Sequence, residues 1–261
     1  MKTYMNNILE SPEFMQGYSL IKGDCLEVMK NIPDKTIDMI LCDLPYGVTQ
    51  NKSDIQIPFD KLWDCYERII KDNGAIVLFA QGVFFVDLVN SNRKMYRYDL
   101  IWDKSLVTGF LNAKRMPLRR HEQIAVFYKK SPVYNPQFTK GRPSHSKGSK
   151  YRNKPVVNNN YGKFQAIESN QSEDKYPTSI ITIQKPHPSK TLHRTEKPVK
   201  LLEYLIKTFS NEGDLILDNC MGSGTTGVAC INTNRKFVGI EIDDTYFETA
   251  KKRIESAING I

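Results

Sequence analysis

The sequence predicts an α/β protein with a doubly wound, mainly parallel sheet and a basic, loop-rich insert. Two observations indicate the sheet: short β-rich runs alternate with helical patterns, and several of these runs are almost wholly apolar. Strands that helices cover on both faces have that composition. A third observation indicates the insert, because one stretch is rich in lysine, proline and tyrosine and departs from either pattern.

The predicted strands are runs of apolar, β-branched and aromatic residues. They cover Ile37–Cys42, Ala75–Phe79, Tyr98–Trp102, Gln123–Tyr128, Leu215–Leu217 and Phe237–Ile242. Helical patterns lie between several of them. The predicted helices cover Phe59–Lys71, Pro198–Phe209 and Thr245–Asn259. Pro198 suits a first helical turn, and Asp243 and Asp244 lie at the positive end of the last helix.

The composition excludes several classes of protein. Of the 261 residues, 40% are hydrophobic and 25% charged, so a core can form and disorder throughout is excluded. No apolar run approaches the ~18 residues that span a bilayer, and the N-terminal segment lacks the apolar stretch of a secretory signal. The five cysteines form no C-x-x-C pair, which favours free thiols in a reducing cytoplasm. The four histidines show no metal-ligand spacing, so no metal is expected.

Residues 129–194 hold the positive charge of the chain. This stretch has thirteen lysines and arginines against three acidic residues, whereas the whole chain carries a net charge of +8. Tyrosines and phenylalanines are interleaved with the cations. Cations hold phosphates and aromatic rings stack on bases, so the mixture favours a nucleic acid over a membrane surface as partner. A solvated basic loop that only keeps the protein soluble is the alternative.

A glycine-rich turn follows the predicted strand that ends before Asp218. Gly222, Gly224 and Gly227 lie at the start of a helix, where backbone can approach a ligand closely. No lysine closes the turn, so it is not a phosphate-binding P-loop. The glycine spacing also suits a nicotinamide dinucleotide, and a purely structural tight turn is the other alternative. The carboxylate of Asp218 can hold a cation such as an ammonium group.

A second strand ends in an acid about twenty residues later, at Glu241. An acid at that position accepts hydrogen bonds from the hydroxyls of an adenosine ribose. The turn and the acid together predict an adenosine-containing cofactor.

A third polar segment, Asp43-Leu44-Pro45-Tyr46, ends the apolar strand Ile37–Cys42. As an isolated tetrapeptide it would be a turn more often than a site. Its position after a buried strand, in a chain with a cofactor turn and a basic insert, favours a functional role.

The chain resembles the amino-methylating DNA methyltransferases that use S-adenosylmethionine, in their permuted "beta" order. The resemblance is carried by five segments. Asp43–Tyr46 is similar to the family's catalytic D/S-P-P-Y motif, here D-x-P-Y, and Arg119–Phe127 to its R/H-E-x-I segment. His193–Pro198 is similar to the H-P-T-Q-K-P motif. Leu217–Thr226 is similar to the L-D-P-F-x-G-S-G-T-T cofactor loop, and Gly23–Val28 to the segment that contacts adenine.

The resemblance implies a Rossmann-like methyltransferase fold and a set of site residues. The implied catalytic residues are Asp43, Leu44, Pro45 and Tyr46. The implied cofactor-binding residues are Asp24, Cys25, Asp43, Thr195, Lys197, Asp218, Cys220, Gly222, Ser223, Gly224, Thr225, Glu241 and Ile242. The candidate DNA-binding residues come from the charge of residues 129–194 and are Lys140, Arg142, Lys147, Lys150, Arg152 and Lys154.

The expected activity is methylation of the N6 amine of adenine in double-stranded DNA, with the target base flipped out. Asp43 and the carbonyl of Leu44 or Pro45 would accept the two N–H groups of the amine, and Tyr46 would stack on the base. An aspartate rather than a serine at residue 43 is the family's usual mark of adenine. Methylation of cytosine N4 and a catalytically inactive DNA-binding relative stay open, whereas carbon-5 methylation is excluded because no Pro-Cys pair occurs.

The same resemblance divides the chain. Residues 1–128 and 195–261 would form the catalytic domain, and residues 129–194 an inserted target-recognition region. A homodimer and a cognate restriction nuclease stay open. The family's pattern is broken where Leu44 replaces a proline, where Asn219 and Cys220 replace Pro-Phe, and where Arg194 and Glu196 replace proline and glutamine.

Overall fold

The computed structural model describes residues 17–47, 55–142, 156–158, 162–164, 173–185 and 196–260. The chain forms two compact units, one of Met1–Asn135 with Ser179–Ile261 and the other of Pro136–Thr178. Four of the DNA-binding candidates (Lys147, Lys150, Arg152 and Lys154) and one cofactor candidate (Thr195) lie outside the described residues.

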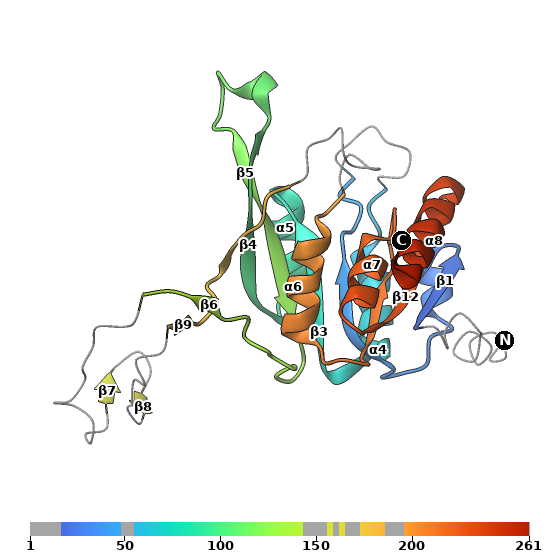
Figure 1. Ribbon diagram of the computed structural model, residues 1–261, viewed down its shortest axis with the longest axis horizontal. Helices are drawn as coiled ribbons and strands as arrows, with labels where there is room; N and C mark the ends of the chain where they lie inside the picture. Colours follow the sequence, from blue (N-terminus) through green and yellow to red (C-terminus); the bar gives the residue numbers. More distant parts are fainter. Residues whose placement is uncertain are drawn as a thin grey trace. The chain divides into compact units, whose positions relative to one another are not determined.

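The first unit is built on an eight-stranded sheet in the order β1-β12-β11-β2-β3-β5-β4-β10 (Figure 1). Neighbouring strands are parallel, except that β5 runs antiparallel to both β3 and β4. The mainly parallel sheet that the sequence predicts is therefore confirmed. The strands are β1 (Tyr18–Lys22), β2 (Ile37–Cys42), β3 (Ile70–Ala80), β4 (Tyr96–Thr108), β5 (Arg119–Phe127), β10 (Ile180–Thr182), β11 (Leu215–Asp218) and β12 (Lys236–Glu241).

The helices of this unit include the three that the sequence predicts. They are α3 (Cys25–Met29), α4 (Phe59–Ile69), α5 (Val83–Ser91), the 3-10 turn η1 (Phe110–Asn112), α6 (Val199–Phe209), α7 (Thr225–Asn232) and α8 (Asp244–Asn259). Helix α4 ends two residues before the prediction because Ile70 already has extended backbone and begins β3. Helix α8 begins at Asp244, because the Asp243 carboxylate accepts the N–H groups of Thr245 and Tyr246.

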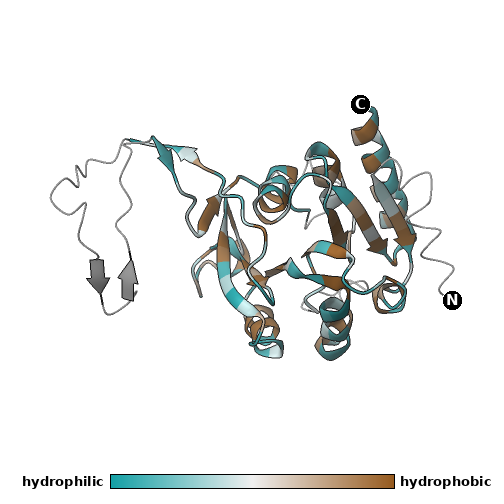
Figure 2. Ribbon diagram, turned by 90° about the horizontal axis from the view of Figure 1, so that it is seen from below, coloured by the Kyte–Doolittle hydropathy of each residue, from teal (hydrophilic) through white to brown (hydrophobic). Residues whose placement is uncertain are grey.

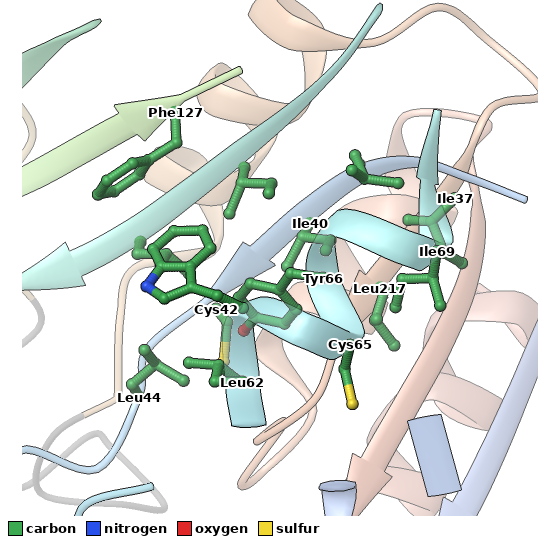
Figure 3. Packing of buried hydrophobic residues seen from close by; sticks show 14 of the residues in the cluster. Ile37, Ile40, Cys42, Leu44, Leu62, Cys65, Tyr66, Ile69, Phe127 and Leu217 are labelled. Atoms are coloured by element: carbon green, nitrogen blue, oxygen red, sulfur yellow. The ribbon is translucent and has the colours of Figure 1, made fainter. Parts of the chain in front are cut away.

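Two apolar layers cover the two faces of the sheet, as a doubly wound fold requires. In β2, Ile40 and Cys42 face helix α4, and Figure 3 shows them against Leu62 and Tyr66. The alternate residues, among them Met39, belong to the opposite layer with helices α6, α7 and α8. Because successive strand side chains point to opposite faces, a strand buried on both sides must be apolar throughout. The hydropathy colouring of Figure 2 shows such apolar strands within the sheet.

Some elements extend beyond what periodicity indicates. Strand β3 begins at Ile70, five residues before the predicted start, although Lys71–Gly74 is polar. Lys71 donates a 2.6 Å hydrogen bond to Asp38 of β2, and a Cβ on Gly74 would lie 2.7 Å from the Asp38 carbonyl oxygen. Contacts with the neighbouring strand therefore extend β3 where its own residues do not favour a strand.

The second unit contains two short antiparallel pairs. Strand β6 (Thr139–Lys140) pairs with β9 (Asp174–Lys175), and β7 (Val156–Asn158) pairs with β8 (Gly162–Phe164). Where the structure describes side chains of this unit, none is buried. The described part of this unit therefore has the loop-rich character that the composition indicates.

The second unit is shorter than the expected insert of residues 129–194. On one side Asn135 donates its backbone N–H to the Thr208 carbonyl and its side-chain amide to the Ser210 carbonyl, at 2.8 and 3.1 Å. On the other side β10 pairs in parallel with β4. Both flanks of the basic stretch therefore belong to the first unit. In the described part of the chain, no helix has the length and hydropathy that crossing a membrane requires.

Candidate active site

A cavity of about 750 Å³ lies where β1, β2, β11 and β12 end. These four strands are parallel neighbours, so their carboxyl ends share one edge of the sheet, which is where open α/β sheets bind ligands. Each strand places an acid there. Asp24 follows β1, Asp43 follows β2, Asp218 ends β11 and Glu241 ends β12, and all four line the cavity together with Lys197.

Most of the other predicted site residues line the same cavity. They are Cys25, Leu44, Pro45, Tyr46, Cys220, Gly222, Ser223, Thr225 and Ile242. Gly224 is not part of the lining, because it faces the last helix. A Cβ at Gly224 would lie 2.7 Å from the Cβ of Ala250, and the residue has a φ of +79°. Gly224 therefore lets α8 pack against the turn.

The Asp43 carboxylate is held from two sides. Lys197 Nζ donates to Oδ2 at 2.5 Å, and the Tyr46 hydroxyl donates to Oδ1 at 3.0 Å. The Tyr46 ring stacks on Phe84 with a centroid distance of 4.6 Å. Burial raises the pKa of the Tyr46 hydroxyl, and the nearby Asp43 charge raises it further. Tyr46 is therefore a neutral hydrogen-bond donor, and Asp43 is fixed at the cavity wall.

Lys197 connects Asp43 to a second carboxylate. The Lys197 side chain is 8% exposed, and its ammonium group lies 3.3 Å from Glu122 Oε2. Burial lowers the pKa of Lys197, but the charges of Asp43 and Glu122 outweigh burial and hold the pKa above its usual value. Lys197 is thus a buried cation between two carboxylates.

Glu122 is in turn paired with Lys104, at 3.2 Å. Burial raises the pKa of Glu122, but Lys197 and Lys104 outweigh burial and bring the pKa below its usual value. Glu122 is therefore ionised, although Oε2 is buried and accepts no hydrogen bond from the described residues. We call Asp43, Lys197, Glu122 and Lys104 the charged network.

Asp218 supports the glycine-rich turn from inside. Its side chain accepts the Thr226 hydroxyl at 2.6 Å and the Cys220 N–H at 3.1 Å. Burial raises the pKa of this carboxyl to about 6. Much of the hydrogen-bonding capacity of Asp218 therefore serves the turn itself.

Glu241 attaches the turn to the end of β12. Its Oε1 accepts the N–H groups of Ile242 and Asp243, both at 2.9 Å, and its Oε2 accepts the Gly222 N–H at 2.8 Å. A carboxylate offers about four acceptor positions, so Glu241 retains capacity for a ligand hydroxyl. Asp24 has a similar local role, because it caps α3 by accepting the Leu26 N–H at 2.8 Å.

Three cysteines that are scattered in the sequence, Cys25, Cys42 and Cys220, line the cavity together. A hydrogen bond with Cys220 raises the pKa of Cys25, and burial raises it further. Burial raises the pKa of Cys42 to about 12. All five cysteines are free. These thiols are therefore neutral packing groups, and Cys42 is the buried strand residue that the sequence indicates.

The main feature that sequence reasoning missed is the charged network. In the sequence, Glu122 belongs to the segment Arg119–Phe127 without a role of its own, and no motif includes Lys104. The pairing of Trp102 with Glu122 between β4 and β5 brings the two charged residues together. The resemblance predicts Lys197 beside the cofactor; in the structure its ammonium group contacts Asp43, and its side chain also lines the cavity.

Three comparisons describe what this chain is similar to. A family model described as DNA methylase, covering N6 and N4 enzymes, matches residues 37–252. The type II methyltransferase M.HpaI of Haemophilus parainfluenzae is 31% identical over 253 residues, which cover 92% of this chain and 75% of the relative. The DNA adenine methyltransferase YhdJ of Escherichia coli is 27% identical over 93% of this chain and 84% of its own length.

A solved structure has the same arrangement of elements. The crystal structure of the M1.HpyAVI–SAM complex matches with a TM-score of 0.62 and 26% identity, over 91% of this chain and 98% of that one. The neighbour supports the Rossmann-like methyltransferase fold. On the family match and the identity to M.HpaI, the chain belongs to the N6/N4 family of DNA methylases.

Proposed function

We propose that this protein transfers the methyl group of S-adenosylmethionine to the N6 amine of adenine in double-stranded DNA, with the target base flipped into the cavity. The observation that carries the proposal is the shared cavity: the Asp43 carboxylate and the turn containing Gly222 line the same space. A cofactor on the turn and a base on Asp43 would therefore meet.

S-adenosylmethionine is the cofactor of this DNA methylase, and the residues present fit it. The cavity volume of about 750 Å³ lies within the range of small-molecule sites. Its acids suit the ribose hydroxyls and the adenine amino group, and a Cβ at Gly222 would meet no atom within 4 Å, so the wall is open there. When bound, the cofactor supplies an electrophilic methyl group on a sulfonium.

The predicted cofactor residues that line the cavity divide among the parts of the cofactor. Glu241 and Ile242 would hold the ribose, and Asp24 and Cys25 the adenine ring. Asp218 and Lys197, with Thr195, would hold the methionine end. The backbone and side chains of the turn would enclose the cofactor through Cys220, Gly222, Ser223 and Thr225, and Gly224 would support the turn by letting α8 pack against it.

The chemistry then depends on Asp43. The N6 amine of adenine is a poor nucleophile because its lone pair is delocalised into the ring. Asp43 accepts one N–H, and the carbonyl of Leu44 or Pro45 accepts the other. These bonds strengthen as positive charge builds on nitrogen, so they favour the transition state over the bound base. Lys197 donates to Asp43 and holds its carboxylate in place, and the Tyr46 ring stacks on the base.

The basic stretch of residues 129–194 is the proposed target-recognition region. Of its candidate DNA contacts, the structure describes Lys140 and Arg142. Arg142 is exposed, and Lys140 pairs with Asp174 at 2.6 Å with 76% of its side chain exposed. An exposed ion pair is weak, so phosphate can replace Asp174 as the partner of Lys140.

Sequencing that maps methylated bases tests the proposal. The chain is expressed in a host without DNA methylation, beside Asp43→Ala as the control. N6-methyladenine at one repeated sequence, absent with the variant, supports the proposal. Detection of N4-methylcytosine instead would show that the target base is cytosine and not adenine. If no DNA is methylated and calorimetry detects no binding of S-adenosylmethionine, the protein is a catalytically inactive DNA-binding relative.

A further inference from the structure

The hairpin of β4 and β5 continues past the sheet as a projecting arm (Figure 1). We define the arm as residues 105–120, of which all but Leu106 and Leu118 are exposed. Its tip carries large apolar side chains: Phe110 is 75% exposed, Leu111 fully, and Met116 48%. Large apolar side chains exposed close together on a projecting hairpin are candidates for an interaction site.

The tip is held in shape by its own backbone. Gly109 has a φ of +91°, which allows the chain to turn into η1. The Gly109 carbonyl then accepts the Asn112 N–H at 2.9 Å, and the Asn112 carbonyl accepts the N–H groups of Arg115 and Met116 at 2.8 and 3.0 Å. Phe110 and Leu111 are therefore presented by an ordered turn.

The charge of the arm indicates what it contacts. Residues 105–120 contain four cations (Lys114, Arg115, Arg119 and Arg120) and no acid. Arg120 is paired with Asp103 at 2.8 Å, but no carboxylate among the described residues pairs with Lys114 or Arg115. A polyanion is the complementary partner, whereas the same arm of a second copy would be repelled.

The base of the arm lies at the cavity. Arg119 pairs with Thr108 where the arm begins, and it lines the cavity that also contains Asp43. Arg119 Nη1 lies 3.5 Å from Gln81 Oε1, another lining residue. A duplex that delivers a base into the cavity would therefore have its stacked pairs within reach of the arm.

We propose that the arm is a DNA-contacting wedge: Lys114 and Arg115 bind phosphates, and Phe110 and Leu111 enter the base stack beside the flipped nucleotide. The inference rests on the proposed function and adds a contact outside the basic stretch of residues 129–194. Apolar side chains flanked by cations insert between base steps in other DNA-binding proteins and unstack them. Such a wedge stabilises the unpaired state that base flipping requires.

Paired variants test the wedge. Phe110→Ser with Leu111→Ser removes the apolar tip, and Val83→Ser with Val86→Ser on α5 is the matched control, since these valines are also 75% and 53% exposed and do not line the cavity. Methylation is measured on a duplex carrying the mapped target sequence, and on the same duplex with a mismatch opposite the target base. We expect the tip variant to lose about tenfold or more on the matched duplex and less than about threefold on the mismatched one.

The control variant should behave as wild type on both duplexes, and binding of S-adenosylmethionine should be unchanged in each variant. Equal methylation of the matched duplex by wild type and tip variant overturns the wedge and leaves the proposed function intact. An equal loss on both duplexes also overturns it, because the tip would then act on something other than unpairing.

Measurements of duplex binding distinguish a failure of the wedge proposal from a failure of the proposed function. Lys114→Ala with Arg115→Ala should weaken duplex binding and reduce the slope of log affinity against log salt by about two, one for each lost phosphate contact. Should wild type methylate no DNA, this loss of binding would still support the arm while the proposed function fails. Unchanged duplex affinity would overturn the proposal that the arm contacts DNA. So would a wild-type dimer that dissociates in the tip variant, because the tip would then be a dimer contact.

Discussion

The two sides of the cavity are built differently. On the proposed cofactor side, Asp218 and Glu241 accept hydrogen bonds from backbone and hydroxyl groups of their own turn and strand end. On the proposed catalytic side, the charged network joins Asp43, Glu122 and Lys197 from three separate segments. The first side is a local structure, whereas the second depends on how distant strands pack.

The difference has an energetic consequence. A local turn loses only a few hydrogen bonds when one acceptor is removed, at about 1–3 kcal/mol for each buried group left without a partner. A buried charge without its partner costs about 3–5 kcal/mol. Substitutions in the charged network should therefore affect folding as well as activity, and substitutions in the turn should affect cofactor affinity first.

The largest effect is expected at Asp43. Asp43→Ala should lower methyl transfer by about a thousandfold, because it removes the acceptor on which the reacting amine depends. Incorporation of labelled methyl groups into DNA measures the rate, and calorimetry measures S-adenosylmethionine binding, which we expect to stay near normal. Turnover that survives the substitution would remove Asp43 from the mechanism.

The next effect concerns the buried charges. Glu122→Gln leaves Lys197 and Lys104 with one carboxylate fewer and should lower the free energy of unfolding by about 3 kcal/mol. Adding Lys104→Met should restore part of that loss, since it removes one of the uncompensated cations. Urea unfolding measures both variants. A double variant no more stable than Glu122→Gln would show that Lys104 does not depend on Glu122.

A third prediction concerns pH. The folded pKa of Asp218 is about 6, against an ordinary value of 3.8, so between these values the folded state binds more protons than the unfolded state. Stability contributed by this group therefore falls as pH rises through that window, by about 3 kcal/mol in total.

Asp218→Asn should remove this pH dependence while retaining an acceptor for the Thr226 hydroxyl. In unfolding measurements from pH 4 to pH 7, the free energy of unfolding of the variant should increase relative to that of wild type as pH rises. A constant difference between the two proteins across that range would contradict the raised pKa of Asp218.

The smallest effect is expected at Glu241. Glu241→Gln should weaken S-adenosylmethionine binding about tenfold, because an amide replaces one carboxylate oxygen that accepts N–H groups. The rate at saturating cofactor should change little. Glu248→Gln, on the exposed side of α8, is the matched control. A larger fall in rate than in affinity would place Glu241 among the groups that act on the transferred methyl group.

Local patterns in the sequence predicted the fold and the position of the glycine-rich turn at the end of a strand. The apolar runs became buried strands, and the Gly222–Gly224 turn lies where a strand meets a helix. Both features depend on residues next to one another in the chain. Backbone conformation and burial on two faces are properties of a short segment, so the residues of that segment are enough to predict them.

Only the tertiary structure decided which charges meet and which apolar side chains stay exposed. Lys197 is 154 residues from Asp43, and Glu122 meets Lys104 through the pairing of β4 with β5. Phe110 and Leu111 differ little in type from core residues, but the hairpin carries them beyond the sheet. Strand register and the reach of a hairpin follow from packing between distant segments, and local periodicity contains no information about either.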